Sequence, residues 1–104
     1  MKFQDIEWKK LNPPIPFRTG ELSVQASAFH YCHPKNNEGP YSLYEVAYRN
    51  SIGDFAKIKE LEPVDDQVYG YVEKEIVIEL LESEGYNRKE ILTLIIWQIN
   101  HKYQ

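Results

Sequence analysis

The densest group of side chains able to do chemistry lies in the segment Phe29-His30-Tyr31-Cys32-His33-Pro34. It holds the one cysteine of the 104-residue chain and two of its three histidines. Zinc takes about four ligands in a tetrahedral arrangement, usually thiolate and imidazole. Because alternate residues of a strand point to one face, His30 and Cys32 form a candidate ligand pair, which His33 could join. The segment is therefore a candidate metal site.

Two observations count against chemistry at this segment. The chain has no second cysteine, and its third histidine, His101, lies far away near the carboxyl end. A nucleophilic Cys32 with His30 or His33 as its base would also need an orienting group and oxyanion donors, and no glycine-rich loop lies nearby. We therefore favour a structural role, in which Cys32 is a buried small side chain with a raised pKa and His30 is hydrogen-bonded beside it. On this interpretation the protein has no catalytic residue, metal or cofactor.

The strand that would position the cluster has a clear alternating pattern, which starts at Glu21 and is typical of a half-buried strand. Its apolar positions are Leu22, Val24, Ala26 and Ala28. Continuing the alternation puts His30 and Cys32 on the same apolar face. Turn-forming residues 34–40 then separate this strand from a second, antiparallel strand over residues 41–48, in which Tyr44, Val46 and Tyr48 share one side.

Two further strands are expected over residues 55–61 and 67–72. Before the sheet, residues 1–20 form an N-terminal arm whose Asn12-Pro13-Pro14-Ile15-Pro16 stretch excludes helix and central strand. We expect this arm to be extended and to pack on the domain through Ile15 and Phe17.

The last third of the chain has helical periodicity over residues 73–84 and again over residues 88–102. Gly85 is placed to end the first helix in a left-handed cap, and Asn87 with Glu90 resembles a capping box for the second. The sequence thus predicts one α+β domain over residues 1–104. A small antiparallel sheet of 3–4 strands in residues 21–72 is followed by a C-terminal αα-hairpin, residues 73–104, packed on one face.

Charge is unevenly distributed along a chain whose net charge is −4. Residues 60–84 carry nine acidic side chains against the single base Lys74, and the segments on either side are weakly positive. On the first helix Glu75, Glu79 and Glu82 follow the spacing i, i+4, i+7, which places them in one outward stripe. Such a stripe disfavours nucleic acid and anionic membranes and favours a basic protein partner.

The second helix is apolar around most of its circumference. One broad face, expected to cover the sheet, contains Ile91, Leu92, Ile95, Ile96, Ile99 and Tyr103. Leu94 and Trp97 fall on the opposite side with His101 beside them, so we expect them to be exposed and to contact a partner. The alternative is that the proline arm or Trp8 covers them.

The sequence therefore predicts a small, non-enzymatic interaction protein that acts by protein–protein contact and forms a homodimer. One cysteine, no signal peptide and no long apolar run indicate a cytoplasmic location without membrane contact. Two alternatives stay open. One is an inhibitor from a phage or mobile element whose acidic helix mimics nucleic acid, and the other is a metal-binding or cysteine-dependent protein centred on His30, Cys32 and His33.

Overall fold

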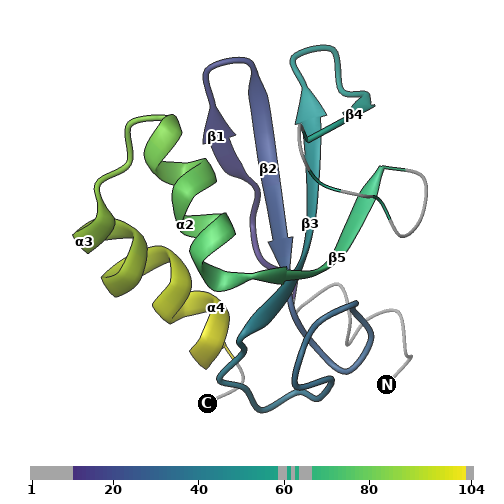
Figure 1. The fold of residues 1–104 in the computed structure, drawn as a ribbon, viewed down its shortest axis with the longest axis vertical. Coiled ribbons are helices and arrows are strands. Elements are labelled where there is room, and N and C mark those ends of the chain that lie inside the picture. Colours follow the sequence, from purple (N-terminus) through teal and green to yellow (C-terminus); the bar gives the residue numbers. More distant parts are fainter. Residues whose placement is uncertain (1–10, 59–60, 62, 64–66, 103–104) are drawn as a thin grey trace.

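The computed structural model describes residues 11–58, 61, 63 and 67–102. Trp8 and Tyr103, to which the sequence assigned a covering role and a core role, lie outside these residues. The protein has the expected α+β architecture, with a small antiparallel sheet on one side and the C-terminal helices on the other (Figure 1).

The sheet has five strands, in the order β1-β2-β3-β4, with β5 also paired to β3. Because β2 occupies one edge of β3, the strands β4 and β5 share its other edge, at different stretches. The strands are β1 (Ile15–Phe17), β2 (Gly20–Gln25), β3 (Leu43–Asn50), β4 (Phe55–Ala56) and β5 (Val68–Glu73).

Two helical segments follow the sheet and lie side by side (Figure 1). The first is α2 (Lys74–Ser83), which begins directly after β5. The second, which we call the last helix, is continuous but has three parts: α3 (Arg88–Glu90), the π-helical η1 (Ile91–Ile96) and α4 (Trp97–His101).

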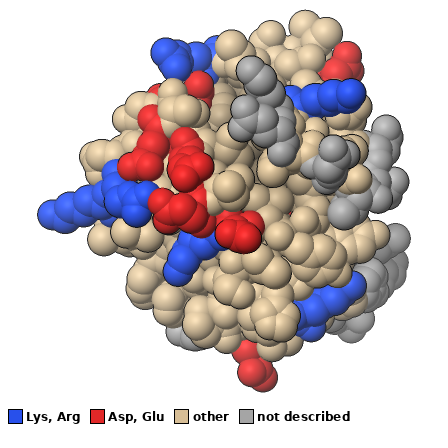
Figure 2. All heavy atoms as spheres, in the orientation of Figure 1, with Lys and Arg blue, Asp and Glu red and all other residues tan. Residues whose placement is uncertain are grey.

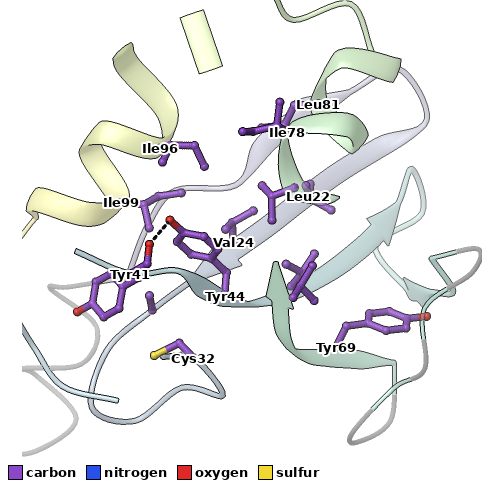
Figure 3. Packing of buried hydrophobic residues seen from close by; sticks show 14 of the residues in the cluster. Leu22, Val24, Cys32, Tyr41, Tyr44, Tyr69, Ile78, Leu81, Ile96 and Ile99 are labelled. Carbon is purple, nitrogen blue, oxygen red and sulfur yellow. Dashed lines mark hydrogen bonds between the residues drawn. The ribbon is translucent and has the colours of Figure 1, made fainter. Parts of the chain in front are cut away.

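The register of the sheet confirms the alternation expected for the two long strands. Leu22 pairs with Tyr48 and Val24 with Val46, which puts the apolar positions of β2 and β3 on one face. Buried residues of both helical segments pack against this face, as Figure 3 shows for Ile78, Leu81, Ile96 and Ile99 beside Leu22, Val24 and Tyr44. The core therefore lies between the sheet and the helices.

The arm contributes a strand, which the sequence did not predict. Residues 15–17 form β1 and pair antiparallel with β2 at the edge of the sheet, where a proline is tolerated because its missing N–H needs no ladder partner. Ile15 and Phe17 are half-buried and pack against the core, as expected. The arm is therefore part of the sheet, and the strand region begins before residue 21.

The first long strand is shorter than its alternating sequence indicated. β2 ends at Gln25, and residues 26–42 form an irregular loop, although Ala26, His30 and Cys32 are still buried. The side chain of Ser27 explains the end of the strand, because its Oγ accepts a hydrogen bond from the Phe29 N–H at 3.0 Å and turns the chain. The expected strand over residues 55–61 is likewise reduced, among its described residues, to β4.

The predicted cap at Gly85 is confirmed, and so is the Asn87 half of the predicted capping box. Gly85 has φ of +99°, and the N–H groups of Gly85 and Tyr86 donate to the carbonyls of Glu82 and Leu81, which is the Schellman pattern. At the start of the last helix, the Asn87 side chain accepts a hydrogen bond from the Glu90 N–H at 2.7 Å. The turn between the helices is thus set by local sequence.

The π-helical turn η1 changes which residues of the last helix face inward. A π turn closes its hydrogen bonds over five residues instead of four, so side chains that follow it are rotated relative to an α-helix. Asn100, which follows the π turn, is buried. Leu92 lies within the turn and is 40% exposed, so its expected place on the covered face was wrong. Among the described residues, no helix is long and apolar enough to cross a membrane.

Candidate functional site

The loop that follows β2 separates the three residues of the candidate metal site. His30 is buried, with its Nδ1 2.6 Å from Ser27 Oγ, and the buried Cys32 directs its Sγ at the Ser27 carbonyl, 3.1 Å away. His33 is exposed, and its backbone bonds to Leu43 and Ser42. In the part of the chain that is described, no three His, Cys, Asp or Glu side chains gather closely enough to hold a metal ion.

Burial also shapes the protonation of these groups. Removal from solvent lowers the pKa of His30 to about 4, with a smaller contribution from the positive charge of Lys102. The neutral imidazole is hydrogen-bonded through Nδ1 to Ser27 Oγ, and the same hydroxyl oxygen accepts from the Phe29 N–H. Burial raises the pKa of the Cys32 thiol above its usual value, as the sequence predicted, so little thiolate forms at neutral pH.

The strongest candidate for a functional surface lies on the outward side of the last helix. Leu94 and Trp97 are each 55% exposed, as predicted, and the indole ring of Trp97 stacks on the imidazole of His101 with 4.4 Å between ring centroids. The His101 Nδ1 lies 2.7 Å from the Trp97 carbonyl oxygen, which fixes the orientation of that ring. We call Leu94, Trp97 and His101 the outer stripe.

The described part of the proline arm does not cover the outer stripe. Residues 12–16 instead border an apolar cleft of about 240 Å³, whose other walls include Tyr86, Ile95 and Ile99. Asn12 anchors the arm in this position, because its backbone and side chain bond to Gln25 and to the Val24 carbonyl. The arm therefore lies beside the last helix, and Trp8, the other expected cover, is not among the described residues.

The acidic residues of α2 point outward as expected, and Figure 2 shows a group of acidic side chains on the face over this helix. The sequence did not indicate that Arg88, at the start of the last helix, lies between two of them. Its guanidinium contacts the carboxylates of both Glu75 and Glu82. The positive charge offsets part of the stripe and ties the two helical segments together.

A second exposed aromatic group was also missed. Tyr31 and Tyr71 are exposed, their ring centroids are 6.1 Å apart, and the Lys35 ammonium lies 5.5 Å from the centre of the Tyr31 ring. Tyr71 has φ of +56°, and its N–H donates to the Tyr31 carbonyl at 2.9 Å. Nothing in the sequence indicated that Tyr71 would lie beside Tyr31.

Comparisons do not add a functional assignment to this geometry. The chain matches no protein-family model, no curated protein and no solved structure.

Proposed function

We propose that this is a cytoplasmic, non-enzymatic interaction protein that acts by protein–protein contact and associates with a second copy of itself through the outer stripe. The exposure of Leu94 and Trp97 carries the proposal. Both side chains are 55% exposed on a helix whose other side already packs against the sheet. Full burial of a large apolar side chain contributes about 1.5–3 kcal/mol, so covering the exposed half of each of these two would contribute roughly 1–1.5 kcal/mol.

A second copy is the occupant we favour. Two-fold pairing places the same surface on both sides of the contact, so the outer stripe can cover itself without a further partner. Tryptophan is also the residue type most enriched among side chains that dominate interface energies.

The alternatives are supported less well. Mimicry of nucleic acid requires a strong negative field, and Arg88 offsets part of it between Glu75 and Glu82. Chemistry at Cys32 requires an accessible thiolate, and this side chain is 1% exposed with a raised pKa.

The proposal predicts that replacing Leu94 and Trp97 by alanine together converts a dimer to a monomer. Light scattering coupled to size-exclusion chromatography, with protein from about 1 to about 100 μM, covers the affinities expected of such an interface. The matched control is an Ile52→Ala/Phe55→Ala variant, because these side chains are also exposed, by 79% and 48%, on the β3–β4 hairpin. We expect the control to stay dimeric. A wild-type protein that is monomeric throughout this range would contradict the proposal.

A further inference from the structure

Glu90, Leu94, Trp97 and His101 follow one another along the last helix at intervals of four, three and four residues. Residues three and four apart lie on the same side of a helix. Leu94 and Trp97 are exposed, Glu90 and His101 at the two ends are half-buried, and the flanking Lys89, Thr93 and Gln98 are exposed as well. We call Glu90, Leu94, Trp97 and His101 the seam. The π-helical turn rotates its two halves relative to each other, but Leu94 and Trp97 both stay outward.

The intervals read the same in both directions, which makes the seam suited to an antiparallel contact with itself. A two-fold axis that crosses the helix between Ile95 and Ile96 exchanges Leu94 with Trp97 and Glu90 with His101. Each Leu94 then packs on the indole ring of the other copy. Both exposed apolar side chains are covered by one operation, as an isologous interface requires.

The charges at the two ends of the seam distinguish antiparallel from parallel pairing. Glu90 makes no ion pair with any described residue. In a parallel pair the two Glu90 carboxylates would face each other, which is unfavourable, whereas an antiparallel pair sets each carboxylate beside the His101 imidazole of the other copy. The opposed helix dipoles favour the antiparallel pair as well.

The orientation of His101 suits this role. Its Nδ1–H donates to the Trp97 carbonyl at 2.7 Å, so Nε2 is the ring nitrogen left to meet a second molecule. In its protonated form the imidazole donates Nε2–H to a carboxylate, and its stacking on Trp97 holds the ring in place.

From this geometry we propose that two copies pair through the seam with their last helices antiparallel, Leu94 on Trp97 and Glu90 beside His101. This inference rests on the proposed self-association and adds the direction and register of the contact, which that proposal leaves open.

Disulfide trapping tests the direction. Glu90→Cys protein is mixed with His101→Cys protein and oxidised, with wild type as the control because its own Cys32 is buried. In the antiparallel pair, residue 90 of one copy meets residue 101 of the other, while the two residues 90 are about 16 Å apart along the axis, too far for a disulfide. We expect the mixed disulfide in the mixture and no disulfide-linked dimer from either variant alone.

Charge exchange provides a second readout that needs no cysteine. Glu90→Lys or His101→Glu alone should raise the dissociation constant about three- to tenfold, and the double variant should restore it, because the pair re-forms with reversed charges.

A parallel dimer would instead link Glu90→Cys to itself and show no rescue, which overturns the antiparallel inference while self-association stands. A dimer that gives neither the mixed disulfide nor the rescue also overturns it. If light scattering shows that the wild-type protein is a monomer, the proposed function itself is overturned.

Discussion

At the scale of single residues, Ser27 contacts both His30 and Cys32, the two buried residues of the candidate metal site. Its hydroxyl oxygen accepts from the Phe29 N–H and lies 2.6 Å from His30 Nδ1, and its carbonyl oxygen lies 3.1 Å from Cys32 Sγ. One side chain thus ends β2 and satisfies the buried imidazole. Alternating apolarity correctly predicted that His30 and Cys32 are buried, but it predicted a strand where a serine-centred turn is present.

The buried imidazole predicts a stability that depends on pH. The pKa of His30 is about 4 in the folded protein and near 6.5 when unfolded, so the unfolded chain binds more protons between these values. The contribution of the neutral His30 to stability is therefore fully present above about pH 6.5, decreases below that pH, and is lost as the pH falls through 4. Protonation of His30 should lower the free energy of unfolding by about 1 kcal/mol between pH 7 and pH 5.

The measurement is urea unfolding of wild type and a His30→Asn variant at both pH values. Asparagine keeps an acceptor for Ser27 but cannot gain a proton, so the variant should lose less stability on acidification. His33→Asn is the matched control, because His33 is exposed and the variant should retain the wild-type dependence. An equal slope for His30→Asn and wild type would show that another group is responsible.

At the scale of elements, the turn between α2 and the last helix depends on Gly85. A Cβ on this residue would meet nothing within 4 Å, so any cost of substitution comes from the positive φ alone. Gly85→Ala should destabilise the protein by about 1–2 kcal/mol, and Gly85→Asn by less, because asparagine tolerates left-handed backbone. Chemical denaturation of wild type and the two variants measures the order of their unfolding free energies. An alanine variant as stable as wild type would mean that the cap is dispensable.

The elements also show where prediction from sequence works. Helical periodicity with Gly85 and Asn87 located both helical segments, and period-two alternation located β2 and β3, because these signals are local. β1 was missed because prolines at 13, 14 and 16 argue against a strand unless its edge position is known. The Arg88 contacts were missed because they join the two helical segments, which no local pattern records, and no signal in the sequence indicated the π turn.

The candidate site, too, was predicted only where local sequence patterns determine it. Exposure of Leu94 and Trp97 was predicted from the helical wheel and is confirmed. Their use by a second copy remains a prediction. The outward acidic stripe was also predicted, but its partial neutralisation by Arg88 comes from a residue six positions beyond Glu82 and on the other helix.

At the scale of the whole molecule, self-association should make thermal stability depend on concentration. If folded protein is dimeric and unfolded protein is not, mass action stabilises the folded state as concentration rises. With a typical unfolding enthalpy per residue, the midpoint should rise about 3 °C for each tenfold increase in concentration. Calorimetry checks this, with Leu94→Ala/Trp97→Ala as the control whose midpoint should not move. A constant midpoint for wild type would argue against a dimer under these conditions.

The loop and the last helix are joined by a buried polar contact between distant residues. Asn100 Oδ1 accepts from the Tyr41 N–H at 3.0 Å, and the Tyr44 hydroxyl lies between this oxygen, at 3.0 Å, and the Tyr41 carbonyl, at 2.8 Å. Gly39 permits the approach, since a Cβ there would lie 2.7 Å from the Asn100 carbonyl oxygen.

Tyr41 and Asn100 are 59 positions apart in the chain. During synthesis on the ribosome, residues 39–44 therefore emerge well before the side chain that holds them. The Tyr41 N–H lacks this acceptor until Asn100 has been added. Nascent chains stopped short of that residue would carry the strands but lack the anchor for the loop.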